Sequence, residues 1–269
     1  MRAYRHKMIG DETGDKRNML TSIKQFEGKK VNFHTHTTRC KHATGEDREY
    51  VERAIEAGFE VLGFSDHAPY LFEDSFVSRM RMDMEQLGEY VESIYALKKE
   101  YEKDIEIYCG LEMEYFPKRF AKTIAEIQKQ PIEYLLLAQH YFDDEVGNIN
   151  VGTPWDDEEH LELYVNRILE GLDTNLFLYV AHPDIIHFTG SDEVYERQMT
   201  RLAVEFKKRN MPVEINISGL RYTDRYPNPK FVEIAKRCGN QFIIGQDAHF
   251  PDCFLDVENY RRAEMLIKD

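Results

Sequence analysis

The chain has 269 residues, with 49 acidic and 35 basic side chains that give a formal net charge of −14. This charge argues against a broad nucleic-acid interface, which needs lysine and arginine side chains clustered on one face. No apolar run approaches the roughly 18 residues of a membrane helix, and the four cysteines form no Cys-x-x-Cys pair that would suggest a zinc ribbon. We therefore expect a soluble, cytoplasmic protein without nucleic-acid or membrane partners.

The chain opens with a polar stretch of mixed charge, residues 1–30, which we interpret as an N-terminal leader that is disordered or loosely docked. From Val31 onward, short β-branched or apolar runs alternate with amphipathic stretches. Seven runs predict strands, at residues 31–36, 60–67, 105–115, 134–140, 177–183, 213–218 and 242–249. Apolar residues recur at helical spacing in residues 46–58, 83–103, 118–130, 160–172, 194–210 and 229–240.

Strands that alternate with helices at this spacing predict parallel βαβ units, and so a single α/β domain over residues 31–269. Seven such units most simply close into a TIM-like barrel, written (β/α)7. A doubly wound open sheet is the alternative.

Side chains of the types that bind metal ions fall at the ends of six of the seven predicted strands. They are His34 and His36, Asp66 and His67, Glu112 and Glu114, His140, His182, and Asp247 and His249. Because the carboxyl ends of the strands meet at one face of a βα barrel, we expect these side chains to converge there.

The first of these strands carries His34 and His36 two residues apart. Side chains at positions i and i+2 of a strand share a face, so these two histidines suit one metal ion. His42 lies beyond a polar loop and is expected to bind a different ion. The whole ligand set is generous even for two ions, which predicts three divalent ions, such as zinc, iron or manganese. Closely spaced ions would make hydroxide available near neutral pH, and we expect Glu112 and Asp247 to hold this metal-bound hydroxide.

Other residues near this rim are candidates for substrate binding, for orienting a ligand histidine or for proton transfer. Arg221, just past the sixth strand, is a candidate phosphate ligand, with a surface salt bridge as the alternative. Arg81 and Arg197 are weaker candidates for the same role. Glu114 would contact a cationic group of a substrate or lie outward in solvent, and Asp66 would orient a ligand histidine or move protons.

The sequence carries FHTHTTRCKH, GFSDHAPY, GLEMEYFP, AQH, AHPD, EINISGLR and GQDAH in this order. In this it resembles the PHP (polymerase and histidinol phosphatase) family, and within the family it is most similar to the L-histidinol-phosphate phosphatases. The resemblance implies a distorted seven-stranded βα barrel with a trinuclear metal centre. It assigns the ligands as follows: His34, His36, Glu112 and Asp247 to one ion, Glu112, His140 and His182 to a second, and His42, His67 and His249 to a third.

The resemblance also implies a reaction: hydrolysis of the small phosphate monoester L-histidinol phosphate, a step of histidine biosynthesis. A PHP-type phosphoesterase acting on nucleotides or oligonucleotide ends is the first alternative, although the acidic chain offers no basic track for an oligonucleotide. An amidohydrolase is a second alternative, and His42, Glu112 and His140 argue against it. A non-catalytic metal-binding protein is a third, but nine ligands shared among three ions would leave positions open for water and substrate.

Overall fold

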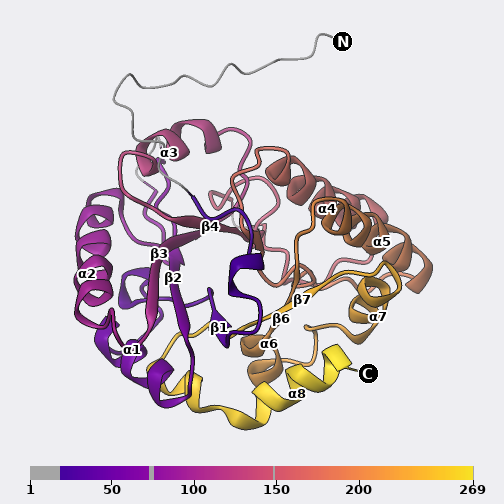
Figure 1. The fold of residues 1–269 in the computed structure, drawn as a ribbon. Helices are drawn as coiled ribbons and strands as arrows, with labels where there is room; N and C mark the ends of the chain where they lie inside the picture. Colours follow the sequence, from indigo (N-terminus) through magenta and orange to yellow (C-terminus); the bar gives the residue numbers. More distant parts are fainter. Residues whose placement is uncertain (1–18, 73–75, 148, 269) are drawn as a thin grey trace.

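The computed structural model describes residues 19–72, 76–147 and 149–268. Seven parallel strands lie side by side in sequence order and curl into a barrel with helices around the outside (Figure 1). The strands are β1 (Val31–Asn32), β2 (Val61–His67), β3 (Glu106–Met113), β4 (Tyr134–Leu137), β5 (Tyr179–Val180), β6 (Val213–Asn216) and β7 (Phe242–Gly245). This arrangement confirms the predicted (β/α)7 barrel and rules out the doubly wound open sheet.

The barrel is closed by the segments that follow β1 and β7. Thr35 forms an isolated parallel bridge with Ala248, in which the His36 amide donates to the Ala248 carbonyl oxygen (2.9 Å). Below this bridge, the amide of Gln246 donates to the side-chain oxygen of Asn32 (2.8 Å) in place of a regular ladder bond. The predicted strand over residues 31–36 is therefore wrong in length, because only its first two residues belong to the regular ladder.

Six helices confirm the amphipathic stretches expected from the sequence. They are α1 (Asp47–Glu56), α2 (Leu87–Glu100), α3 (Phe120–Ile127), α4 (Glu158–Leu172), α5 (Asp192–Lys208) and α7 (Pro229–Arg237). Three of them begin at a side chain that accepts a hydrogen bond from a free backbone N–H, namely Asp157, Ser191 and Asn228. Within the described ranges, no helix combines the length and hydrophobicity needed to cross a bilayer.

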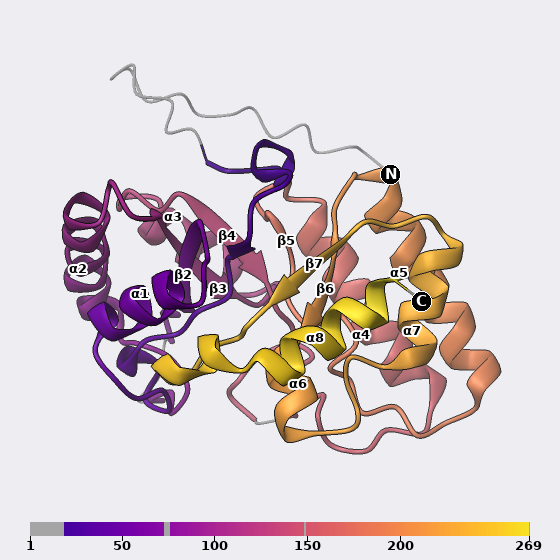
Figure 2. The ribbon, with the colours of Figure 1, turned by 60° about the horizontal axis from the view of Figure 1, so that its bottom comes forward.

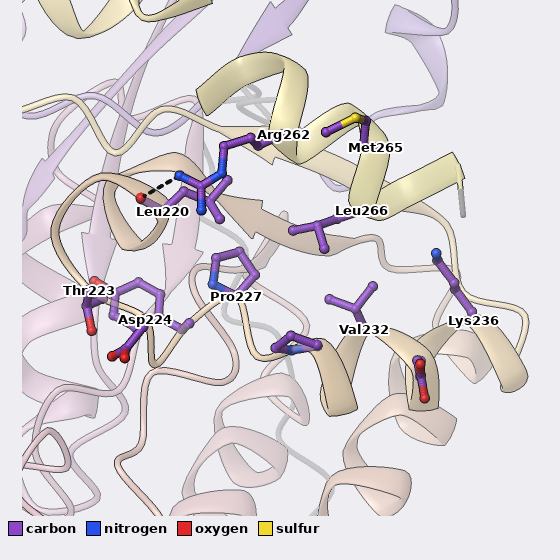
Figure 3. Close-up of a pocket in the computed structure, with 12 residues that line it drawn as sticks. Leu220, Thr223, Asp224, Pro227, Val232, Lys236, Arg262, Met265 and Leu266 are labelled. Atoms are coloured by element: carbon purple, nitrogen blue, oxygen red, sulfur yellow. Dashed lines mark hydrogen bonds between the residues drawn. The ribbon is translucent and has the colours of Figure 1, made fainter. Parts of the chain in front are cut away.

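Two α-helices within the described residues were not expected from the sequence. α6 (Ile217–Tyr222) is a six-residue helix that starts directly after β6, and α8 (Val257–Lys268) runs along the outside of the barrel beside α6 and β7 (Figure 2). Only Ala263 of α8 is fully buried, so most of this helix lies at the surface. A cavity of about 550 Å³ lies between α6, α7 and α8, lined by side chains such as Leu220, Lys236 and Arg262 (Figure 3).

Part of the expected leader packs against the barrel. Residues 1–18 lie outside the described residues, but Phe26 is only 4% exposed. Its ring lies 5.2 Å from that of Phe33 and 5.5 Å from that of Tyr108, and it belongs to the apolar cluster inside the barrel. Residues 19–30 therefore cover the end of the barrel at which the strands begin.

The interior of the barrel is crossed by Tyr134, which points inward from β4. Its hydroxyl group donates to the carbonyl oxygen of Phe33 (2.8 Å) and also lies 2.9 Å from that of Phe64. Gly63 and Gly110 provide the space, because a methyl group at either position would overlap the tyrosine side chain. The absence of a side chain at these two positions lets one residue link β4 to β2 and to the segment directly after β1.

We predict that Gly110→Ala destabilises the protein by about 1–3 kcal/mol, because the added methyl group must displace a buried ring in a packed interior. Thermal unfolding should show a Tm lower by roughly 2–10 °C. Gly88→Ala on α2 is the control, because its methyl group would meet nothing nearer than 3.9 Å. A Gly110→Ala protein as stable as the Gly88→Ala protein would contradict this account.

Candidate metal centre

The predicted metal ligands meet at the carboxyl ends of the strands, around a cavity of about 560 Å³. Eight of the nine line the cavity: His36, His42, His67, Glu112, His140, His182, Asp247 and His249. The ninth, His34, lies directly behind them and is fully buried. The structure thus brings together all nine side chains that the sequence singled out.

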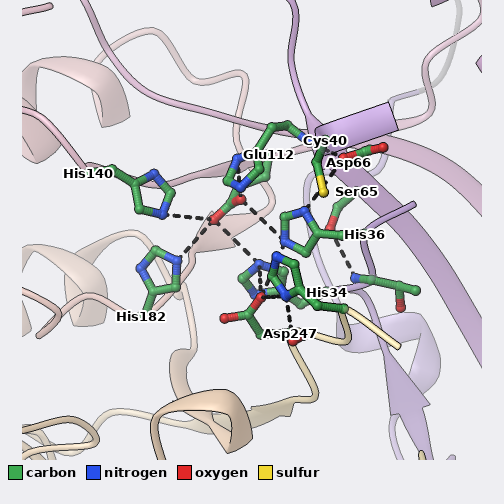
Figure 4. Close-up of polar contacts among 12 residues, drawn as sticks. His34, His36, Cys40, Ser65, Asp66, Glu112, His140, His182 and Asp247 are labelled. Atoms are coloured by element: carbon green, nitrogen blue, oxygen red, sulfur yellow. Dashed lines mark hydrogen bonds and ion pairs between the residues drawn. The ribbon is translucent and has the colours of Figure 1, made fainter. Parts of the chain in front are cut away.

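The carboxylate of Glu112, near the end of β3, lies at the middle of this group (Figure 4). Five imidazole rings from four other segments surround it, and their nearest nitrogen atoms lie 2.9–3.9 Å from its two oxygens. They are His67 Nδ1 at 2.9 Å, His182 Nε2 at 3.0 Å, His34 Nε2 at 3.4 Å, His36 Nε2 at 3.5 Å and His140 Nε2 at 3.9 Å. A carboxylate in this position can bridge two ions, because each oxygen faces different histidines.

Asp247 is the second carboxylate of the cluster. Its Oδ1 atom lies 3.2 Å from His36 Nε2, 3.3 Å from His249 Nδ1 and 3.5 Å from His34 Nε2. The backbone torsion φ is +47° at Asp247 and +30° at His182, in the left-handed region that costs a non-glycine residue of order 1 kcal/mol. These bends lie two residues after β7 and β5, where His182 faces Glu112 and Asp247 faces His36.

His42 reaches the rim from the loop after β1. Its Nδ1 atom lies 2.7 Å from the carbonyl oxygen of Cys40, which directs Nε2 toward His249 Nε2 at 2.9 Å. The rings of His67 and His42 lie 5.4 Å apart. His42, His67 and His249 therefore form one corner of the site, which adjoins Asp247 because His249 Nδ1 lies 3.3 Å from Asp247 Oδ1.

Three more buried carboxylates lie behind the histidines. Glu214 Oε1 is 2.9 Å from His34 Nδ1, Glu114 Oε1 is 2.9 Å from His140 Nδ1, and Asp66 Oδ1 is 3.6 Å from His36 Nδ1. A histidine that donates Nδ1–H to a carboxylate presents its Nε2 lone pair to the cavity, as metal-binding histidines do. Asp66 makes no hydrogen bond to the His36 ring at this distance, and its Oδ1 accepts from the His67 amide (2.8 Å), so the orienting role expected from the sequence stays a prediction.

Glu214 was missed by the sequence analysis, which found no ligand on the sixth strand. Besides His34, this glutamate binds the amide of His182 (2.6 Å) and the side chain of Asn216 (3.0 Å). Gly245 on the neighbouring β7 makes room for it, because a methyl group there would overlap its carboxylate. The only sequence signal was a charged residue between the apolar Val213 and Ile215.

Several buried polar atoms of the cluster have no hydrogen-bond partner. Those that face the cluster are His34 Nε2, His36 Nε2, His67 Nδ1 and Glu112 Oε2. A buried polar atom without a partner costs about 1–3 kcal/mol, so a set of them directed at one another calls for a cation between them. Imidazole and carboxylate donors in this number fit a multinuclear centre of divalent ions.

The electrostatics of the cluster agree with this fit. Burial alone would raise the pKa of Glu112, but the surrounding imidazoles hold it well below its ordinary value. Burial likewise lowers the pKa of His34, yet the carboxylates of Glu214, Asp247 and Glu112 together raise it to about 10. The carboxylates thus stay ionised and draw a proton onto His34, which a bound cation would displace. Burial lowers the pKa of His67 and of His249, so these two rings are already neutral, as a metal ligand must be.

The four residues that the sequence suggested for substrate binding do not line this cavity. Arg221 lies on α6 and donates to Asp256 (2.9 Å), and the exposed side chain of Arg197 on α5 pairs with a glutamate of α4. Arg81 and Glu114 are fully buried and bind each other, so Glu114 is not a solvated side chain. No lysine or arginine is among the described lining residues.

Other lining residues were not singled out by the sequence. They are Thr44, Met80, Ile185, Ser218, Tyr222, Tyr226 and Phe250. Apolar and aromatic side chains therefore adjoin the polar cluster, and a substrate with a polar end and an organic body fits this division.

Comparison with known proteins places this cluster in a family. The model of the PHP domain matches residues 32–218. The chain belongs to the PHP domain family. Among its relatives is a probable histidinol-phosphatase of Deinococcus radiodurans, 28% identical over 239 residues, which cover 81% of this chain and 85% of that protein. The histidinol-phosphatase of Bacillus subtilis is 26% identical over 256 residues, which cover 80% of this chain and 92% of the relative.

Solved structures of this family share the fold of the PHP chain. The histidinol phosphate phosphatase of Lactococcus lactis, solved in complex with zinc, L-histidinol and phosphate, has a TM-score of 0.67 at 21% identity, covering 89% of this chain and 93% of that one. A histidinol phosphatase structure from Listeria monocytogenes has a TM-score of 0.68 at 22% identity. The match covers 83% of this chain and 97% of that one. Both confirm the distorted barrel.

We predict that zinc stabilises the chelator-treated protein and that Glu112→Gln removes most of this effect, because the amide cannot bridge two cations. At a free zinc concentration about 100 times Kd, one bound ion adds roughly 2.7 kcal/mol, which raises Tm by roughly 5–10 °C. Thermal unfolding of both proteins with and without zinc measures the difference. An equal rise in Tm for the two proteins would exclude Glu112 from metal binding.

Proposed function

We propose that this PHP-family chain is a phosphoric monoester hydrolase that converts L-histidinol phosphate and water to L-histidinol and phosphate, a cytoplasmic step of histidine biosynthesis. The observation that carries the proposal is the convergence of seven histidines and two carboxylates around one cavity. The names of relatives that align with more than three quarters of the chain support the substrate.

Three divalent ions are proposed to occupy the cluster. His34, His36 and Asp247 would bind the first ion and His140 and His182 the second, with Glu112 bridging the two. The third ion would lie in the corner formed by His42, His67 and His249. The first ion is supported by the triad of His34, His36 and Glu112, whose potential ligand atoms lie within 4.8 Å of one another. The 2.9 Å between the Nε2 atoms of His42 and His249 supports their sharing the third ion. Zinc, iron and manganese all suit a mixed imidazole and carboxylate set.

When bound, divalent ions supply positive charge that attracts the phosphate dianion and lowers the pKa of the attacking water. The residues of the chain prepare the site for this chemistry. Glu112 and Asp247 contribute the negative charge that holds the cations, and Glu214 and Glu114 keep the rings of His34 and His140 in their binding orientation.

Recognition of the organic part of the substrate would fall to the apolar side of the cavity. Tyr222, Tyr226 and Phe250 lie beside the histidine cluster, and their rings can pack against an imidazole group. Because the described lining has no arginine or lysine, the cations would carry most of the phosphate recognition. That Arg221 contacts phosphate stays a prediction, and such a contact would require its ion pair with Asp256 to open.

We expect L-histidinol phosphate to have the highest kcat/KM in a phosphate-release assay that also contains nucleoside monophosphates and sugar phosphates. The aromatic wall of the cavity matches its imidazole group. Metal content is measured on the same sample. A nucleotide with a higher kcat/KM would move the assignment to the alternative PHP-type activity on nucleotides.

We predict that His42→Ala loses about one metal ion per chain, because this histidine serves only the third ion. His36→Ala should abolish activity more completely, since its ring contacts both Glu112 and Asp247. Elemental analysis after identical metal loading measures both effects, with circular dichroism as a check of the fold. His160→Ala is a matched control, because this histidine stacks on Trp155 outside the cluster. A His42→Ala protein with full metal content would show that His42 is an ordinary loop residue.

A further inference from the structure

Arg81 is fully buried, although its side chain carries a permanent charge. Its two terminal nitrogens donate to both oxygens of Glu114, each at 3.0 Å, and Nε donates to Glu145 at 2.7 Å. One terminal nitrogen also donates to the carbonyl oxygen of Ala68 at 3.2 Å. A guanidinium group in such a fork is fixed in position, because each of these bonds restricts its plane.

These bonds join segments that follow three consecutive strands. Ala68 comes directly after β2, Glu114 directly after β3, and Glu145 lies in the connection between β4 and α4. Arg81 does not line the cavity of the metal centre, so its charge acts on its protein partners. Any effect of Arg81 on the histidine cluster must therefore pass through one of these partners.

Glu114 provides the connection to the proposed metal ligands. Its Oε1 atom accepts from Arg81 at 3.0 Å and also lies 2.9 Å from His140 Nδ1. The Nε2 atom of the same ring faces Glu112 Oε1 at 3.9 Å. Arg81 therefore holds the carboxylate that sets both the ring orientation and the tautomer of His140.

The other strongly held histidine is arranged differently. Glu214, which binds His34 Nδ1, is held by neutral donors: the His182 amide and the side chain of Asn216. His140 is also more exposed than His34, with 15% of its side chain accessible against 0%. The orientation of the His140 ring therefore depends more on its carboxylate partner, Glu114, which is held by the charged Arg81.

We infer that Arg81 is a positioning residue for metal binding: it acts through Glu114 on His140 and sets the affinity for the ion that His140 binds. This inference rests on the proposed metal centre. It assigns to Arg81 a role inside the protein in place of the substrate contact that its sequence position suggested.

The test is Arg81→Lys, which keeps the charge but cannot bind both oxygens of Glu114 in a planar fork. We expect about 10–100-fold weaker affinity for one bound ion and unchanged affinity for the others. Competition with a chromophoric zinc chelator measures the affinities, elemental analysis gives the stoichiometry, and circular dichroism confirms the fold. Arg119→Lys is the matched control, because Arg119 forms a similar pair with Asp144 (2.6 Å) in the same region without touching a proposed ligand.

A double variant separates positioning from a general structural effect. In a His140→Ala background, Arg81→Lys should cause no further loss of metal affinity, because the ring through which it acts is gone. Glu114→Gln provides a second route to the same result if Arg81→Lys does not fold, and it should weaken the same ion.

The outcomes are distinguishable. Wild-type zinc affinity in a folded Arg81→Lys protein would overturn the inference. So would a loss of zinc affinity on adding Arg81→Lys to His140→Ala that equals the loss it causes in the wild-type background. Wild-type affinity in Glu114→Gln would overturn it as well. A wild-type protein that binds no zinc would instead overturn the proposed metal centre.

Discussion

The closure of the barrel and the assembly of the metal-type ligands depend on the same few backbone hydrogen bonds. The bridge between Thr35 and Ala248 joins the first and last units of the barrel, and each bridge residue lies between two candidate ligands. Residues 34–36 and 247–249 therefore cannot shift relative to one another without opening the barrel. The geometry of the site is thus maintained by the fold and not only by whatever the site binds.

The polar groups of the rim alternate in a way that lets many ionisable side chains be buried together. Glu112 and Asp247 lie at the middle, imidazole rings surround them, and Glu214, Glu114 and Asp66 lie outside the rings. Every carboxylate therefore faces an imidazole. Isolated buried charges would be costly, whereas this alternation gives each one a partner of opposite or adaptable charge.

The sequence predicted the barrel and the convergence of the nine ligands well, because both follow from the repeating βα unit and from where each unit ends. It overestimated strand lengths such as 177–183, where only Tyr179–Val180 is ladder, since apolar runs continue past the regular pairing. It also could not pair Arg81 with Glu145, which is 64 residues away, because only the fold brings them together. Glu214 escaped notice because its inward direction is a property of the closed barrel.

The space above Gly245 limits which substitutions this site can accept. The Glu214 carboxylate occupies the volume that any side chain on the neighbouring strand would need. The two positions are therefore coupled: a larger residue at 245 is compatible only with a shorter one at 214, and His34 would then lose its acceptor. Any variation in evolution or design at this pair must pass through a state in which one histidine of the rim is free to rotate.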